Sequence, residues 1–264
     1  MNSWLRLNSG PCEAAFNMAL DEALLEQISR LGQPVLRFYG WTEPAATFGY
    51  FQNFAGVERA TRLRPLIRRP TGGGLVPHDR DWTYCAVFPP SHEWHSLPAT
   101  ESYRRIHDWL RLAFAALNVQ TELAGRSRPA VLERPRGERE EAQTSNVEGG
   151  GRRAESSEGL LTPVATEVTG QCFIGHEKFD LLWHDNKIAG AAQRRNRLGL
   201  LIQGSVQPPP LPLKRADFEA AMCAVAAEKF RAAWAELAPD AGLRHRAEEL
   251  TAQKFSQAGY NRKR

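Results

Sequence analysis

The chain has 264 residues, of which 42% are hydrophobic and 24% charged, and its formal net charge is +4. This length and composition suit one domain with a sizeable buried core. The sequence has no run of about 18 apolar residues and no signal-like start, so we expect a cytoplasmic protein without a membrane-spanning helix. The mild positive charge permits nucleic-acid binding without requiring it, and we expect no nucleic-acid or membrane partner.

Apolar residues at helical spacing predict one helix over residues 13–28 and another over residues 101–117, the second capped by Thr100. Short β-rich segments separated by Gly and Pro lie between these helices. They are residues 35–39, 46–51, 66–68 and 82–88.

Residues 125–166 differ in composition, because Arg, Glu, Ser and Gly are frequent there and large apolar residues are rare. We therefore predict a mobile, low-complexity insertion within one domain that spans residues 1–264. Strands are predicted after it, at residues 172–173, 179–183, 187–193 and 198–206. Helices at residues 217–237 and 244–255 then form a helical C-terminal segment that starts at about residue 215. Strands followed by helices, without regular alternation, indicate an α+β fold with a mainly antiparallel sheet flanked by helices.

The four cysteines are widely spaced, with no pair at zinc-ligand spacing, so we expect neither a disulfide framework nor a metal site. Cysteines in this setting are usually small buried apolar residues. Only Cys172 has neighbours that favour another role.

A glycine loop is the most informative segment: Arg68-Arg69-Pro70-Thr71-Gly72-Gly73-Gly74-Leu75-Val76-Pro77-His78-Asp79. Three glycines allow positive φ angles and a close approach of the backbone to a ligand. The N–H groups of such a turn can bind an anion, and the arginines can neutralise a phosphate or a carboxylate. The segment matches neither a P-loop nor a dinucleotide-binding motif. A flexible hairpin tip would explain the triple glycine by itself equally well.

A second segment begins with Lys187 and Ile188 and continues with four small residues, Ala189-Gly190-Ala191-Ala192. Strand interiors usually carry larger residues, so a row of small ones suggests that a ligand or an acyl chain lies across the sheet. Lys187 would then direct a cation at the polar end of the ligand. A closely packed strand with a solvated lysine is the alternative.

Together these segments resemble the lipoate–protein ligase A and octanoyltransferase family, whose catalytic domain is related to that of biotin–protein ligases. Four stretches match in the family's order, at residues 17–22, 36–41, 68–79 and 187–195. The similarity extends from about residue 4 to residue 206, apart from the insertion. It implies the fold of the biotin/lipoate protein ligase catalytic domain. The Gly-Arg-Gly-Arg-Arg-Gly loop of biotin–protein ligases themselves is not present.

By this resemblance, the glycine loop and the arginine before it hold the acyl substrate or an acyl-adenylate, and Lys187 contacts the acyl carbonyl or a phosphate. The implied substrate-binding residues are Arg69, Thr71, Gly72, Gly73, Gly74, Leu75, Val76, Pro77, His78, Asp79, Gly190 and Ala191. We expect His78 and Asp79 to close the loop by hydrogen bonds rather than to transfer protons.

Two reactions occur in this family. A ligase activates free lipoate or octanoate with ATP and Mg, whereas a transferase takes octanoate from the thioester of acyl carrier protein and needs no cofactor. In both, the acceptor is a lysine of a lipoyl domain or of the glycine-cleavage H protein. Cys172-Phe173 and Phe179-Asp180-Leu181 resemble the cysteine-dependent octanoyltransferases, and the chain has no room for the accessory domain of many ligases.

We therefore predict an octanoyltransferase with Cys172 and Lys187 as catalytic residues, since a nearby cation favours a thiolate. Two departures keep an ATP-dependent ligase and a non-catalytic carrier-binding homologue as alternatives. Ile174-Gly175-His176-Glu177 replaces a Ser-containing turn, and Gln203-Gly204 stands where many members have His-Gly.

Overall fold

The computed structural model describes residues 2–125 and 175–263. Cys172 and all but the first residue of the predicted insertion lie outside the described residues. Within the described residues, no helix combines the length and the apolar character needed to cross a membrane.

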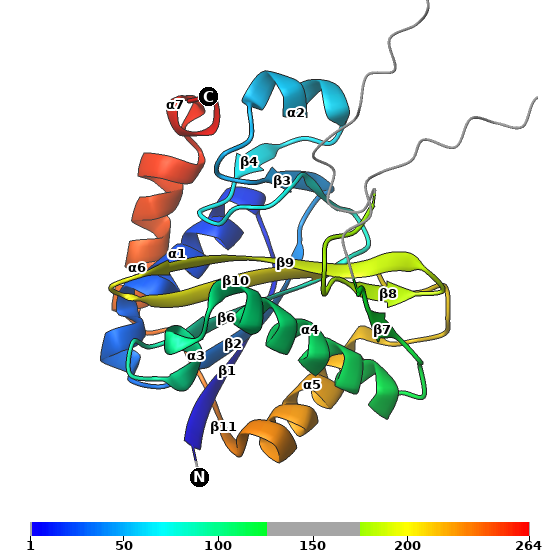
Figure 1. The fold of residues 1–264 in the computed structure, drawn as a ribbon. Helices are drawn as coiled ribbons and strands as arrows, with labels where there is room; N and C mark the ends of the chain where they lie inside the picture. The colour runs from blue at the N-terminus through cyan, green and yellow to red at the C-terminus, as the bar shows by residue number, and fades with distance from the viewer. Residues whose placement is uncertain (1, 126–174, 264) are drawn as a thin grey trace, which may run out of the picture.

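An eight-stranded sheet forms the centre of the fold (Figure 1), with the order β11-β1-β2-β6-β10-β9-β8-β7. The strand β1 pairs in parallel with β2 and β11, and the remaining neighbours are antiparallel. The predicted α+β class with a mainly antiparallel sheet is therefore confirmed. The strands are β1 Asn2–Cys12, β2 Val35–Trp41, β6 Trp82–Phe88, β7 Glu122–Leu123, β8 Leu181–Trp183, β9 Asn186–Asn196, β10 Gly199–Val206 and β11 Ala232–Glu236.

A smaller three-stranded sheet, in the order β4-β3-β5, carries the glycine loop. Its strands are β3 Ala45–Phe48, β4 Leu66–Arg68 and β5 Val76–His78, and the helix α2 Phe54–Ala60 follows β3. The loop connects β4 to β5. In Figure 1 this small sheet and α2 lie on one side of the long β9–β10 hairpin. The glycine loop lies against β9, since a Cβ on Gly73 would be 3.3 Å from Ala192 Cβ.

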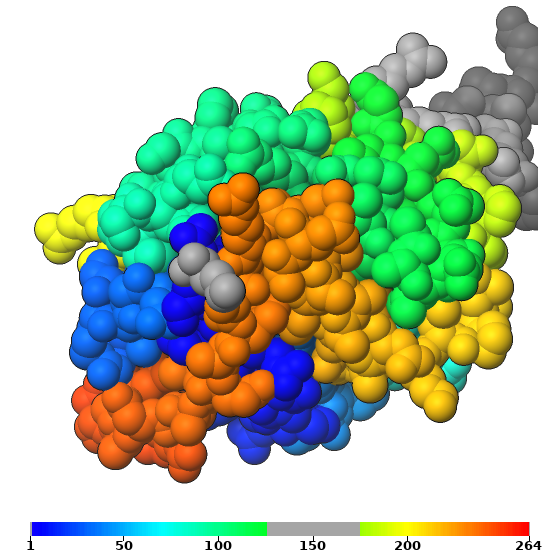
Figure 2. All heavy atoms as spheres, turned by 90° about the horizontal axis from the view of Figure 1, so that it is seen from below, coloured from blue at the N-terminus to red at the C-terminus, as the bar shows by residue number. Residues whose placement is uncertain are grey.

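Helices cover both faces of the large sheet. They are α1 Ala14–Leu31, α3 Glu93–Ser96, α4 Ala99–Ala116, α5 Arg215–Phe230, α6 Ala241–Leu250, the π-helical turn η1 Thr251–Phe255 and α7 Ala258–Asn261. On one face, α4 and α5 lie side by side (Figure 2) over buried Trp4, Phe88, Trp94 and Trp109. On the other face, α1 and α6 pack against each other and against the sheet. The helix α1 ends where Gly32 takes a left-handed conformation and its N–H binds the carbonyl of Ile28, a common way to end a helix.

The C-terminal part corrects one prediction. The helix expected over residues 217–237 ends at Phe230, and Arg231, with φ of 55°, turns the chain into β11. Trp234 in that strand packs its ring 5.6 Å from the ring of Trp4, while Phe230 stacks on Trp4 from the helix. The contact with Trp4 of β1, a strand that the sequence did not predict, therefore outweighs the helical spacing of residues 231–237.

The start of the helix α4 also differs from the prediction. It begins at Ala99, after Pro98, and Thr100 lies inside the first turn rather than at the cap. The boundaries of the strand at residues 82–88 and of the strand at residues 66–68 agree with the predictions.

Candidate functional site

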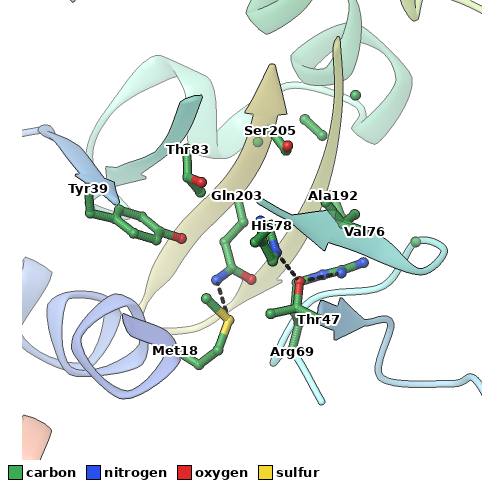
Figure 3. Close-up of a pocket in the computed structure, with 14 residues that line it drawn as sticks. Met18, Tyr39, Thr47, Arg69, Val76, His78, Thr83, Ala192, Gln203 and Ser205 are labelled. Atoms are coloured by element: carbon green, nitrogen blue, oxygen red, sulfur yellow. Dashed lines mark hydrogen bonds between the residues drawn. The ribbon is translucent and has the colours of Figure 1, made fainter. Parts of the chain in front are cut away.

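A pocket lies between the glycine loop and the β9–β10 hairpin (Figure 3), with a volume of about 390 Å³ that includes its open mouth. It is lined by Met18, Tyr39, Thr47, Arg69, Gly73, Val76, His78, Thr83, Gly190, Ala191, Ala192, Gln203, Gly204 and Ser205. Met18 and Tyr39 are fully buried, whereas Gly73 is exposed and Ala192 partly exposed. The pocket therefore opens to solvent at Gly73 and Ala192 and ends at buried side chains of α1 and β2.

The backbone of the glycine loop is held from two sides. Gly73 has φ of 84°, which favours glycine, and a Cβ atom there would lie 3.2 Å from Arg69 Nη2 and 3.3 Å from Ala192 Cβ. From behind, Gly49 lies so close that a Cβ on it would meet the Gly73 carbonyl oxygen at 1.9 Å. At Gly72, by contrast, a Cβ would meet nothing within 4 Å. Of these two loop glycines, Gly73 is therefore the one whose surroundings leave little room for a side chain.

Arg69 holds the same turn through its guanidinium group. Its Nη2 donates to the carbonyl oxygens of Gly72 at 3.0 Å and Gly74 at 2.6 Å, and its Nη1 donates to Thr47 Oγ1 at 2.9 Å. The side chain is buried and lines the pocket. In this structure Arg69 thus fixes the shape of the glycine turn, in addition to placing a positive charge at the pocket.

A chain of hydrogen bonds continues from Thr47 through His78 to Asp81. His78 Nε2 lies 2.7 Å from Thr47 Oγ1, and His78 Nδ1 lies 2.8 Å from Asp81 Oδ2. Burial lowers the pKa of His78 despite the neighbouring Asp81. The ring is therefore neutral near pH 7, so Nδ1 donates to Asp81 and Nε2 accepts from Thr47.

Asp81 is the end point of this chain and takes the place that we predicted for Asp79. Burial alone would raise the pKa of Asp81, but His78, with the hydroxyls of Ser205 and Thr83, lowers it overall. Ser205 Oγ and Thr83 Oγ1 donate to Asp81 Oδ2 at 2.7 and 2.9 Å. The Asp79 side chain, in contrast, is 60% exposed and lies 4.0 Å from Arg80.

A second buried network joins the glycine loop to α1 through Gln203. Thr71 Oγ1 donates to Gln203 Oε1 at 2.7 Å, and Gln203 Nε2 donates to Asp21 Oδ2 at 2.7 Å. Asp21 is also paired with Arg37 at 2.6 Å and accepts from Tyr39 at 2.9 Å. From the sequence, Gln203 was singled out only because many members of the family have histidine at this position. Its partners, which are 132 and 182 residues distant in sequence, show that it bridges two of the matched stretches, at residues 17–22 and 68–79.

These two networks determine the chemical character of the pocket. The polar side chains that line it are hydrogen-bonded, either to one another or to Asp21, Thr71 and Asp81 behind the lining, so the surface that faces the cavity is mainly carbon. Burying such groups without partners would be costly, whereas satisfied networks are tolerated and hold their members rigidly. The arrangement suits an extended apolar group whose polar end lies near the glycine turn.

Lys187 lies outside this lining, at the beginning of β9. Its ammonium pairs with Asp180 Oδ2 at 2.7 Å, and its side chain is 6% exposed. Tyr103 donates to the other oxygen of Asp180 at 2.5 Å, and His107 of α4 completes this corner. Burial lowers the pKa of His107 to about 4, although Asp180 opposes the shift. The pocket thus has Gly73 on one side and Gly190 and Ala191 on the other, whereas Lys187, three residues before Gly190 on the same strand, is not among the residues that line it.

The structure brings six of the predicted binding residues into the pocket lining: Arg69, Gly73, Val76, His78, Gly190 and Ala191. The other six lie in the loop or directly after it and do not line the cavity: Thr71, Gly72, Gly74, Leu75, Pro77 and Asp79. Leu75 packs in a separate cluster with Phe48 and Val57, and Pro77 is exposed. Met18, Asp21 and Asp81 were not among the predicted site residues. Met18 and Asp21 belong to the matched stretch at residues 17–22, which was the available signal.

Comparisons with known proteins agree with this architecture. The lipoyl protein ligase A/B catalytic domain matches residues 13–208, and the chain belongs to this family. The resemblance drawn from the four motifs is thereby confirmed.

Among curated relatives, the octanoyltransferase LipM of Geobacillus kaustophilus is 34% identical over 212 residues, and that of Anoxybacillus flavithermus is 32% identical over 212 residues. Each alignment covers 77% of this chain and 64% of the relative, so the chain matches slightly less than two thirds of their length. A solved lipoate–protein ligase A bound with ATP has a TM-score of 0.66 at 18% identity, and the match covers 99% of this chain and 98% of that chain. At that identity the likeness concerns the fold alone.

Proposed function

We propose that the protein is an octanoyltransferase of protein lipoylation. It takes octanoate from the thioester of acyl carrier protein and passes it to a lysine of a lipoyl domain or of the glycine-cleavage H protein. No cofactor is required in this reaction. The observation that carries the proposal is the pocket itself, whose inner surface is mainly carbon and whose mouth is formed by the glycine turn. The octanoyltransferase relatives support the choice of acyl group and reaction.

In the proposed reaction the thiolate of Cys172 attacks the carbonyl carbon of the donor thioester. The resulting oxyanion collapses, the bond to the carrier's sulfur breaks, and that sulfur takes up a proton. The octanoyl group is then held as a thioester on Cys172. The neutral amine of the acceptor lysine attacks this thioester, loses a proton, and releases the Cys172 thiolate as the amide forms.

Two groups of the described residues have proposed roles in these steps. Backbone N–H groups of the turn at Gly72, Gly73 and Gly74 would bind the developing oxyanion, as donors held in advance of the reaction do. Lys187 would favour the thiolate of Cys172 and keep a positive charge near the reacting carbonyl. The carboxylate of Asp180 holds the Lys187 ammonium at 2.7 Å, which defines where that charge is available.

Product formation without ATP tests this proposal. The wild-type chain is incubated with octanoyl–acyl carrier protein and a lipoyl domain, and octanoylation of the domain is followed by mass spectrometry. We expect transfer that needs no ATP and is lost in Cys172→Ser, while Cys12→Ser, a control cysteine, transfers at the wild-type rate.

The ATP-dependent ligase is the alternative that the same experiment addresses. A parallel reaction contains free octanoate or lipoate with ATP and Mg in place of the thioester. Modification only in this second reaction, with formation of an acyl-adenylate, would contradict the proposed transferase. Binding of the carriers without modification in either reaction would identify a non-catalytic homologue.

A further inference from the structure

A large aromatic side chain is exposed next to the glycine loop. Phe51 is 72% exposed, and Leu211, 41% exposed, is the other exposed large hydrophobic residue among those that the structure describes. The Phe51 ring packs edge-on against Tyr50 with a centroid distance of 5.1 Å, so its outer surface faces solvent. Exposed aromatic residues with polar or charged neighbours are typical of protein-binding surfaces.

Phe51 is attached directly to the mouth of the pocket. Two residues before it, Gly49 contacts the backbone of Gly73, which lines that mouth. One residue before it, the Tyr50 N–H donates to the carbonyl oxygen of Thr71 at 2.9 Å. A protein that contacts Phe51 would therefore lie beside the entrance through which an acyl group has to pass.

Two cations of the C-terminal segment lie in this region, Lys263 against Tyr50 and Arg262 against Phe54. Lys263 Nζ lies 3.9 Å from the centre of the Tyr50 ring and 4.4 Å from that of Tyr260. The Arg262 guanidinium lies 5.1 Å from the centre of the Phe54 ring, and both basic residues are exposed. Figure 1 shows α7, which precedes them, at the same end of the molecule as α2 and in the neighbourhood of β4.

We infer that Tyr50, Phe51, Arg262 and Lys263, which we call the Phe51 rim, dock an acidic surface of the carrier protein that delivers the acyl thioester. The inference rests on the proposed function, because that reaction requires a protein-borne acyl group at this mouth. The carrier's thioester arm has to enter past Gly73 while its folded body stays outside. The rim offers that body an aromatic contact and two cations that pair with carboxylates and steer its approach.

The experiment compares a donor that has a protein body with one that lacks it. Transfer to a lipoyl domain at saturating concentration is measured with octanoyl–acyl carrier protein and with octanoyl-pantetheine. For Phe51→Ser we expect a KM for the carrier about tenfold higher with kcat unchanged, as for loss of a central interface aromatic. The KM for octanoyl-pantetheine stays at the wild-type value. Leu211→Ser is the matched control, and we expect it to change neither KM.

Charge reversal supplies a second, independent variant. Lys263→Glu should raise the KM for the carrier at low salt, and the difference from wild type should shrink at high salt, because exposed charges are screened. Lys229→Glu on α5, a 46% exposed side chain beside Glu228, is its control and should leave the KM unchanged.

Several results would overturn the docking surface. In Phe51→Ser, the KM for the carrier could stay unchanged, or the KM values for both donors could rise equally, or only the KM for the acceptor domain could rise. Binding of single-stranded nucleic acid that depends on Phe51 and Lys263 would also contradict it. Binding of the acyl carrier protein to wild type and Phe51→Ser is also measured by surface plasmon resonance, which needs no turnover. A wild-type chain that transfers from neither donor would contradict the proposed function, whereas carrier binding that depends on Phe51 would still support the rim.

Discussion

The two faces of the large sheet carry different kinds of buried side chain. The face under α4 and α5 is filled with aromatic rings, among them Trp4, Trp94 and Trp109, which contact one another edge-on. The face under α1 carries buried charged and polar groups, and of these Asp21 and Arg37 have side chains with 0% exposure. The pocket opens on this second face.

The aromatic face mainly stabilises the fold, whereas the polar face holds the residues of the functional site in position. On the aromatic face, apolar burial stabilises the fold, and a side chain of similar volume can replace another at modest cost. On the polar face, each group depends on a few specific partners, and removing one member leaves the others buried and incompletely hydrogen-bonded. The hydrogen bonds of the polar face can therefore fix the position of the glycine loop relative to α1. Apolar packing, in which similar side chains can replace one another, would fix that position less specifically.

Breaking the central ion pair is the strongest test of this comparison. Arg37 donates to Asp21 at 2.6 Å and to Asn17 Oδ1 at 2.6 Å. We expect Arg37→Leu to lower the free energy of unfolding by about 3–5 kcal/mol, because the Asp21 carboxylate would remain buried without its positively charged partner and would keep only the hydrogen bonds from Tyr39 and Gln203. Urea denaturation measures this change. The control is Arg246→Leu, whose side chain is 36% exposed and pairs with Glu26, and it should cost about 1 kcal/mol or less. Equal losses in the two variants would contradict the comparison.

His107, a buried titratable group of α4 beside the Asp180–Lys187 ion pair, should make the stability of the aromatic face depend on pH. His107 has a pKa lowered to about 4 by burial. Since its unfolded pKa is about 6.5, its contribution is present above that value and is lost as the pH falls toward 4. Between pH 7 and pH 5, wild type should lose about 2 kcal/mol more than His107→Gln. Unfolding measured at both pH values checks this, and parallel losses in the two proteins would show that His107 is not the group involved.

The smallest effect on stability, with a clear effect on activity, is expected in the glycine turn. Gly73→Ala places a Cβ at a positive φ and against Arg69 and Ala192, so it should cost about 1–2 kcal/mol and lower transfer activity. Gly72→Ala is the matched control, since its Cβ meets nothing within 4 Å. Octanoyl transfer rates and thermal unfolding of both variants measure these two effects. Similar activities in the two would mean that the shape of the turn at Gly73 is not important.

Local pattern predicted much of the fold. The helix α1, the strand β6 and the small-residue strand β9 follow from spacing that each segment carries in its own sequence. The end of α5 did not follow, because Phe230 and Trp234 fit a continuous helix and only contact with Trp4 separates them. Pairing between distant segments is a property of the folded chain and is not visible in a local window.

The site was predictable to a similar extent. The family motif located Arg69, Gly73 and His78 at the pocket. It did not distinguish Asp79 from Asp81 as the partner of His78, because both lie within three residues of it and only the backbone direction after β5 decides. The bridge of Gln203 between Thr71 and Asp21 depends on three separate elements, so sequence alone could not have shown it.

In the proposed reaction, octanoate passes through a thioester on Cys172 without ATP. The most direct measurement is the mass of the intact protein, followed by peptide mapping, after brief mixing with octanoyl–acyl carrier protein in the absence of an acceptor and of ATP. We expect one octanoyl group on the peptide that contains Cys172, and its loss when a lipoyl domain is added. An unmodified Cys172 together with acyl-adenylate formation from free octanoate and ATP would contradict the account.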